Sequence, residues 1–158
     1  MNREQLIIKT IETLLTHLGV TFTSITVEND ERTKSLRFVI VTNDSLILIG
    51  ENGARLLAFN HLVKRMVEKE PKEDAPSFMV DVNDFQKKRI DEIRAKANML
   101  AERARFFKSS VEMDPMSSYE RMIVHSEFTD APDVCTESSG YGKDRHVTIR
   151  YTESKTLV

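Results

Sequence analysis

The sequence has little of the chemistry that crosslinks a small protein or anchors it in a membrane. Its 158 residues include one cysteine and no tryptophan. A single thiol cannot form an internal disulfide or a zinc site made of several thiolates, and this favours a reducing compartment. No run reaches the roughly 20 apolar residues of a membrane span, and the first residues lack the apolar stretch of a signal peptide. We therefore expect a cytoplasmic protein with no membrane association.

Sequence signatures of enzymes are also missing. There is no Gly-x-x-x-x-Gly-Lys-Ser/Thr phosphate loop, no His-Glu-x-x-His and no Gly-x-Ser-x-Gly. The spacing of the four histidines does not indicate a metal site, and Cys135 lies in an alternating segment where packing is its expected role. We predict no catalysis, no cofactor and no metal. A nucleotide hydrolase is the least favoured hypothesis, because no base–nucleophile pair is visible.

Charge is nearly balanced but unevenly distributed. The formal net charge is −2, which argues mildly against nucleic-acid binding because phosphate contacts usually need a basic patch. Residues 87–108, however, carry 8 Lys and Arg against 3 Asp and Glu. These cations either extend a nucleic-acid surface or form the solvated face of a helix, and the two interpretations remain open.

The first half of the chain has the periodicities of a small α+β unit. Apolar residues at helical spacing predict a helix over Glu4–Leu18 and another over Ala54–Val67, which the polar segment 69–74 ends. Strands are expected at Thr21–Val27, Ser35–Thr42 and Ser77–Val82, with a short helical turn after Asn43. The order is αββααβ. The residues expected to face inward on the second long helix are Leu56, Leu57, Phe59, Leu62, Val63 and Met66.

The second half begins with a long helix. It starts at Asn83-Asp84 and runs for roughly 24 residues. Its apolar stripe is Ile90, Ile93, Ala97, Leu100, Ala104 and Phe107. A short strand near Val111, a helix capped by Ser117 and Glu120, and a terminal hairpin follow. We place a domain boundary near Asn83, which gives domains of residues 1–82 and 83–158 joined by the long helix.

Two glycines frame a short loop in the run Gly50-Glu51-Asn52-Gly53, which leads into Arg55. Glycines let a backbone approach a ligand closely, and the amides at the start of the next helix attract an anion such as phosphate. Taken alone, Gly-x-x-Gly favours an ordinary bend, because the pattern is frequent by chance. Its place between two helices of an αββααβ unit favours phosphate binding, because KH domains clamp about four nucleotides with such a loop.

A second pattern places Arg121 and His125 four residues apart, on one helix face. Arginine is a fork-shaped donor for phosphate, and histidine can donate to phosphate or stack on a base. An isolated Arg-x-x-x-His is usually structural, for example when the arginine holds a carboxylate such as Glu137. Neighbouring residues favour the binding role, namely the run Met113–Glu120 before the pair and Thr136–Gly140 after it, with Arg145 beyond.

These motifs together resemble a type II KH domain over residues 1–82 followed by an R3H domain, a small antiparallel sheet packed with helices. This combination resembles the Jag family of bacterial RNA-binding proteins. The resemblance implies that single-stranded RNA, or single-stranded DNA, is bound through two sets of residues. The first set is Gly50, Glu51, Asn52, Gly53 and Arg55, and the second is Arg121, His125, Ser138, Gly140, Lys143 and Arg145.

The chain departs from the family pattern at three places. Glu51 and Asn52 stand where many such loops carry Lys or Arg, and Ser118 stands where a proline is expected. The chain also begins at the first KH helix, so we expect it to lack the N-terminal Jag domain. A carboxylate in the loop opposes phosphate. An alternative is therefore a protein–protein adaptor whose KH half pairs with another KH-like subunit or with a second copy of itself.

Overall fold

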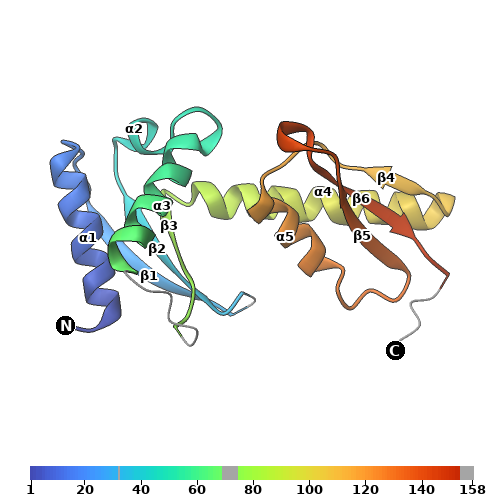
Figure 1. The fold of residues 1–158 in the computed structure, drawn as a ribbon, viewed down its shortest axis with the longest axis horizontal. Coiled ribbons are helices and arrows are strands. Elements are labelled where there is room, and N and C mark those ends of the chain that lie inside the picture. Colours follow the sequence, from blue (N-terminus) through green and yellow to red (C-terminus); the bar gives the residue numbers. More distant parts are fainter. Residues whose placement is uncertain (32, 69–74, 154–158) are drawn as a thin grey trace. The chain divides into compact units, whose positions relative to one another are not determined.

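The computed structural model describes residues 1–31, 33–68 and 75–153, so the polar segment 69–74 that was predicted to end a helix lies outside the described residues. The chain forms two compact units, Met1–Lys87 and Lys88–Val158 (Figure 1). Each unit combines helices with a three-stranded sheet. The predicted α+β class is confirmed, and each unit is described by itself below.

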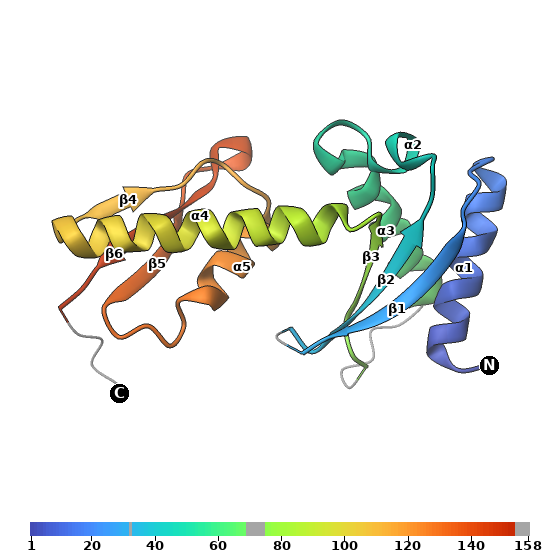
Figure 2. The ribbon, with the colours of Figure 1, turned by 180° about the vertical axis from the view of Figure 1, so that it is seen from behind.

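The first unit has the predicted element order αββααβ. Its helices are α1 (Arg3–His17), α2 (Ser45–Ile49) and α3 (Ala54–Val67), with a 3-10 turn, η1 (Glu51–Gly53), before α3. Its strands are β1 (Ser24–Asp30), β2 (Ser35–Val41) and β3 (Phe78–Val82). In the order β1-β2-β3, β1 runs antiparallel and β3 parallel to the central β2. Figure 2 shows this sheet from behind, with β1 and β2 lying across α1 and α3.

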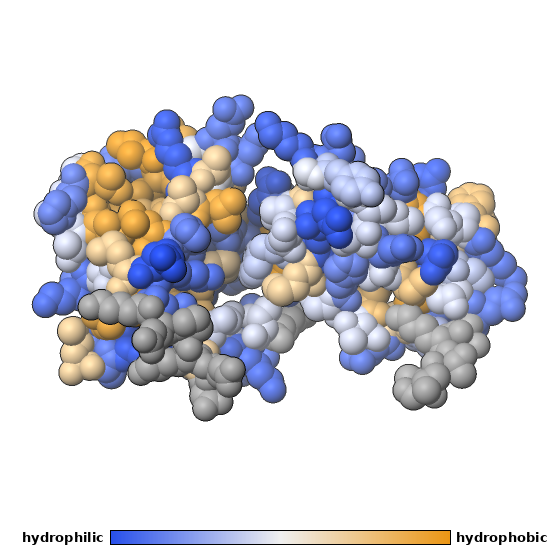
Figure 3. Space-filling view, in the orientation of Figure 1, coloured by the Kyte–Doolittle hydropathy of each residue, from blue (hydrophilic) through white to orange (hydrophobic). Residues whose placement is uncertain are grey.

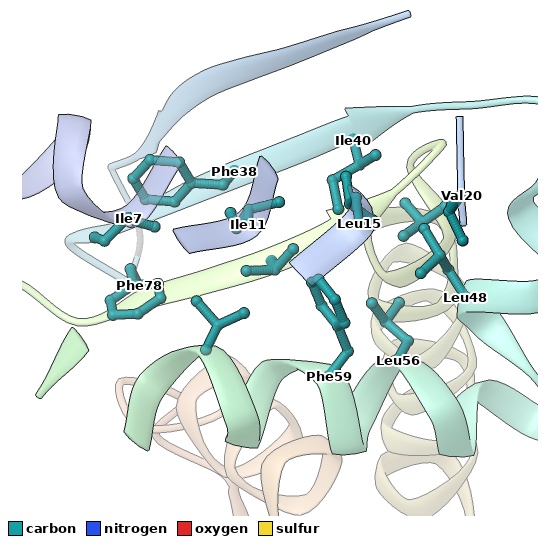
Figure 4. Packing of buried hydrophobic residues seen from close by; sticks show 13 residues of the cluster. Ile7, Ile11, Leu15, Val20, Phe38, Ile40, Leu48, Leu56, Phe59 and Phe78 are labelled. Carbon is teal, nitrogen blue, oxygen red and sulfur yellow. The ribbon is translucent and has the colours of Figure 1, made fainter. Parts of the chain in front are cut away.

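The core of the first unit lies between its helices and one face of the sheet (Figure 4). On α1 the buried residues recur every four positions, which places them on a single stripe. They are Ile7, Ile11 and Leu15. In β2 and β3 the inward residues alternate, as strand geometry requires. They are Phe38, Ile40, Phe78, Val80 and Val82, and the rings of Phe38 and Phe78 meet edge to face.

The predicted inner face of α3 was too wide. Leu57, Leu62 and Met66 are exposed, because α3 rests on the core along a narrow stripe and not across half its circumference. Asn60 is buried in that stripe, which no apolar pattern indicated. Its amide donates to the carbonyl of Val80 and accepts from the amide of Val80, both at 2.7 Å. These bonds satisfy backbone groups of the edge strand β3.

The second unit contains α4 (Phe85–Phe107, with its first turn in the first unit), α5 (Ser118–Glu127) and three antiparallel strands. The strands are β4 (Ser110–Glu112), β5 (Val134–Ser139) and β6 (His146–Tyr151), in the order β4-β6-β5. The helix begins at Phe85 and not at Asn83, because Asn83 and Asp84 both have a positive φ. A 3-10 turn, η2 (Gly142–Asp144), joins β5 to β6.

Small residues let α4 pack closely in the second core. Ala97, Ala101 and Ala104 are fully buried along one side of the helix. The residues they pack with are Met113, Val124, Phe128, Val134, Val147 and Ile149. Phe107, predicted as the last member of the buried stripe, is exposed, because the helix extends past the core that its alanines contact.

Candidate nucleic-acid interface

The loop Gly50–Gly53 links α2 to α3 through left-handed backbone. Gly53 has a φ of 80°, and a Cβ at this position would lie 2.9 Å from the ring of Phe85. Glycine is therefore required both by the backbone and by the ring. Asn52 also has a positive φ, of 51°, a conformation that asparagine tolerates better than most residues. Glu51 and Asn52 are both exposed, so this loop offers solvent a carboxylate, an amide and backbone groups.

Arg55 is the basic residue next to this loop. Its aliphatic part covers Gly50, since a Cβ there would lie 2.5 Å from the Arg55 Cγ, and its guanidinium donates to the Ile47 carbonyl at 3.4 Å. Ile47 is half exposed beside it, but Leu56 is fully buried in the core. The predicted inward position of Leu56 is therefore confirmed.

In the second unit, α5 begins with the predicted capping box. The Ser117 hydroxyl accepts from the Glu120 amide, and the Glu120 carboxylate accepts from the Ser117 amide. Glu120 also pairs with Arg89 of α4. Burial by itself raises the pKa of Glu120, but the bonds from Arg89 and Ser117 outweigh it and hold this pKa below its usual value. The start of α5 is thus fixed by a charged cap.

Arg121 lies one residue after this cap and folds back over the N-terminal turn of α5. Its guanidinium donates to the Met116 carbonyl at 2.8 Å and to the Ser118 hydroxyl at 3.0 Å. Both acceptors are uncharged, so neither of them neutralises the positive charge of the Arg121 guanidinium. The alternative in which Arg121 holds Glu137 is wrong, because Glu137 is exposed and forms no ion pair with it.

His125 lies one turn further along α5, where it is bracketed by two hydroxyls of β5. Its Nδ1 lies 2.6 Å from the Thr136 Oγ1, and its Nε2 lies 2.8 Å from the Ser138 Oγ. A neutral imidazole donates at one nitrogen and accepts at the other, so one hydroxyl keeps its own hydrogen free for a ligand. The structure thus brings together His125 and Ser138, both predicted, and adds Thr136, which the sequence reasoning missed.

The turn between β5 and β6 lies against the segment that precedes α5. The Met116 amide donates to the Arg145 carbonyl at 3.1 Å, and the Arg145 side chain donates to the Gly140 carbonyl at 3.3 Å. Because Arg121 also bonds to Met116, a continuous set of hydrogen bonds joins Arg121, Met116, Arg145 and Gly140. Lys143 is exposed in the same turn.

The cations of the second unit differ in whether a carboxylate neutralises them. On α4, Arg89, Lys96 and Arg105 each contact a carboxylate of the same unit. Other cations have no carboxylate at ion-pair distance within the described residues, and they are Lys88, Arg103, Lys108, Arg121, Lys143, Arg145 and Arg150. Three of them, Arg121, Lys143 and Arg145, come from α5 and the adjacent turn, so part of the unneutralised positive charge belongs to the elements that carry the predicted site.

The titration of His125 gives a first testable expectation. Burial, and then the positive charge of Arg121, lower the pKa of His125 below its ordinary value. A histidine that binds protons less readily when folded stabilises the fold above the unfolded pKa of about 6.5, and this stabilisation is lost as pH falls through the lower folded value. We expect the melting temperature to fall between about pH 7 and pH 5, and to fall less in His125→Gln. Equal pH dependence in both proteins would contradict this expectation.

The described part of the chain lacks two other kinds of site. None of its helices combines the length and the apolar character needed to cross a membrane. Nor do these residues include a group of three or more His, Cys, Asp or Glu side chains arranged to hold a metal ion.

Comparisons with known proteins identify a domain in the second half of the chain. A family model described as R3H domain matches residues 91–151. The RNA-binding protein KhpB of Clostridium symbiosum is 31% identical over 125 residues, which cover 79% of this chain and 56% of that protein. KhpB of Bacillus subtilis is 28% identical over 123 residues, covering 77% and 59%.

KhpB of Streptococcus pneumoniae serotype 2 is 30% identical over 131 residues, which cover 78% of this chain and 38% of that protein. The chain thus spans somewhat more than half the length of the first two relatives, and less of the third. It therefore contains an R3H domain and is homologous to the bacterial RNA-binding proteins KhpB of the Jag family.

Proposed function

We propose that this chain is a cytoplasmic protein that binds single-stranded RNA without catalysis, and that the surface around Arg121 and His125 is its main contact. The observation that carries the proposal is the set Arg121, Lys143 and Arg145, which have no carboxylate partner among the described residues and come from α5 and the turn after β5, the elements that also hold His125 and the Ser138 hydroxyl. Phosphate oxygens are acceptors, and this surface offers guanidinium, ammonium and hydroxyl donors. The R3H match over residues 91–151 supports the same ligand class.

Each residue of the surface has a distinct role in this proposal. Arg121 presents the guanidinium N–H groups that remain beyond its bonds to Met116 and Ser118. His125 orients Ser138 and Thr136 and is not itself the positive charge, because its pKa is lowered. Lys143 and Arg145 supply further charge from the turn, in which Gly140 packs closely against the backbone of Asp144 and Arg145.

For the first unit we propose a type II KH-like domain over residues 1–82. Its αββααβ order and the Gly50–Gly53 loop between α2 and α3 support this. The loop would contact phosphate through backbone groups and Arg55, since Glu51 opposes phosphate electrostatically. Two modest contacts in one chain raise each other's effective concentration, so the R3H surface can dominate affinity while this loop adds to it.

Replacing Arg121 tests the proposal directly. Arg121→Ala should weaken the binding of a short single-stranded RNA by roughly 1–3 kcal/mol, the scale of a lost charge-assisted contact. The slope of log affinity against log salt should also become shallower by about 0.7, because one phosphate contact is lost. Fluorescence anisotropy of a labelled oligonucleotide at several salt concentrations measures both quantities.

Lys96→Ala is the matched control, because it removes an exposed cation of the same unit that already contacts Asp114. It should leave affinity and salt slope nearly unchanged. If Arg121→Ala lowers the melting temperature strongly but leaves the affinity of the folded protein intact, the arginine is structural and the proposed interface is wrong. Equal salt effects in the two variants would likewise show that only overall charge matters.

The protein–protein adaptor remains the second candidate, and one observation favours it. Apolar side chains gather on the face of the first unit seen in Figure 3. Exposed apolar residues of that unit include Leu18, Leu46, Ile47, Leu57, Leu62 and Met66. Exposed apolar surface of this kind is typical of interfaces. A KH-like partner or homodimer formed there would be disrupted by Leu62→Glu, with RNA affinity of the second unit unchanged.

A further inference from the structure

The C-terminal end of α4 exposes two adjacent phenylalanines. Phe106 is 82% exposed and Phe107 is 64% exposed, and their rings meet edge to face with centroids 5.0 Å apart. Burying a phenylalanine side chain contributes about 1.5–3 kcal/mol, so the fold forgoes a substantial gain at two neighbouring positions. Neither ring belongs to the core of the second unit.

The geometry of α4 places Phe106 away from that core. The buried alanines Ala97, Ala101 and Ala104 define the inner side of the helix, and Phe106 lies half a turn from Ala104 in the helical repeat. Met99, seven residues earlier, lies on the same outer side and is 62% exposed. The outer side of the last two turns thus presents flat and flexible apolar groups to solvent.

Positive charge flanks these rings. Arg103 lies three and four residues before the two phenylalanines, so it shares their surface, and Lys108 follows them directly. Both cations are exposed, and within the described ranges neither has a carboxylate at ion-pair distance. Glu102 is the nearest acidic residue in the helix, and it is held by Arg105. Exposed aromatic rings beside free cations are the arrangement with which proteins stack the bases of single strands and hold their phosphates.

We infer that Phe106, supported by Phe107, Arg103 and Lys108, is a stacking site for an unpaired base of single-stranded RNA, separate from the Arg121–His125 surface. The inference rests on the proposed RNA-binding function and adds a second contact within the same unit. It assigns the ring of Phe106 to the base, and the ammonium and guanidinium groups to the adjoining phosphates. Base identity is not selected, because every base has a π-face.

A protein partner fits the same patch less well. A stable protein interface buries about 800 Å² on each side and has an apolar centre. Here the rings are followed by Lys108, Ser109 and Ser110, all exposed and polar, so the apolar area ends within one helical turn. Charge complementarity favours a polyanion, and a ring on a polar, basic background favours a base.

The absence of tryptophan from the chain permits a direct test. Phe106→Trp introduces a single indole whose fluorescence is quenched when a base stacks on it, while a label on the RNA reports binding independently by anisotropy. We expect the indole to be quenched by a single-stranded oligoribonucleotide, but not by a ribose-phosphate oligomer of equal length that lacks bases. Ala95→Trp, exposed on the same outer side about three turns earlier, is the matched control and should stay unquenched.

Affinity gives a second measurement. Phe106→Leu, which keeps apolar area but loses the flat ring, should weaken RNA binding about fivefold or more, whereas Phe106→Tyr should retain it. RNA binding with an unquenched indole would overturn the stacking site alone, whereas the absence of any anisotropy change would overturn the RNA-binding proposal as well. An indole signal that depends on protein concentration without RNA would assign the patch to a second copy, and would also overturn the inference.

Discussion

Replacing Asp81 by asparagine is expected to remove about 3–5 kcal/mol from the stability of the first unit, the cost of breaking a buried ion pair. Asp81 is fully buried, and both of its oxygens accept from donors. One accepts from the amides of Val82 and Gln86, and the other from Arg37 and from the amide of Lys87. An asparagine of the same shape must place its NH₂ group against one of these donor sets.

The experiment has a matched control and an internal reference. Asp84 contacts the same Arg37 but is about half exposed, so Asp84→Asn should cost about 1 kcal/mol or less. All three tyrosines lie in residues 119–151, so tyrosine fluorescence follows the second unit while far-UV circular dichroism follows both. In urea titrations the dichroism transition should move in Asp81→Asn more than the tyrosine transition does. Losses of equal size in the two variants would contradict the buried-pair argument.

The ion pair between Arg37 and Asp81 could not be predicted from the sequence. Arg37 and Asp81 come from two strands and are 44 residues apart, and each reads locally as a polar residue on a half-exposed strand. The periodicity of β2 and β3 does not indicate that an ion pair between Arg37 and Asp81 links the two strands on the face opposite the core. The buried position of Asn60 was not predicted for the same reason, because its partner Val80 is 20 residues away in the sequence. Side chains that satisfy distant backbone groups leave no signal in a local window.

Local signals, by contrast, were reliable. The capping box of α5 was predicted because Ser117 and Glu120 are three residues apart, and the structure confirms it. The element order of the first unit followed from period-two and period-3.6 patterns in the same way. The error on α3 arose because Leu57, Leu62 and Met66 fit a broad helical stripe, while contact with the sheet selects a narrower one. The apolar pattern of a sequence therefore predicts which side of a helix faces the core, but not how wide the buried stripe on that side is.

The candidate site in the second unit could be predicted from the sequence only in part. Arg121 and His125 were found by helical spacing. The partners of Arg121 lie within five residues of it, whereas the partners of His125 depend on how α5 lies on β5. Thr136 was missed although a signal existed, because residues two apart in a strand share a face and Ser138 had already been singled out. Because Thr136 and Ser138 face the same side of β5, Thr136 could have been predicted as a contact of His125 as soon as β5 was placed beside α5.

The last prediction concerns the turn that carries Lys143 and Arg145. Gly140 has a φ of 88°, and a Cβ there would lie 2.9 Å from the Asp144 carbonyl oxygen and 3.3 Å from the Arg145 Cα. Both neighbours are backbone atoms, so they cannot move aside by a change of side-chain rotamer. Gly140→Ala should therefore destabilise the second unit by about 2–3 kcal/mol, since it adds a clash to the cost of a left-handed backbone.

Gly142 separates these two causes, because it also has a positive φ but no atom lies within 4 Å of its would-be Cβ. Gly142→Ala should cost only about 1 kcal/mol, the backbone preference alone. Because Arg145 bonds to the Gly140 carbonyl and its own carbonyl holds Met116, a displaced turn should also weaken RNA binding in Gly140→Ala. Tyrosine-monitored unfolding and RNA anisotropy measure the two effects. If both alanine variants behave alike, the close packing within this turn does not position the cations, and Arg121 must act without them.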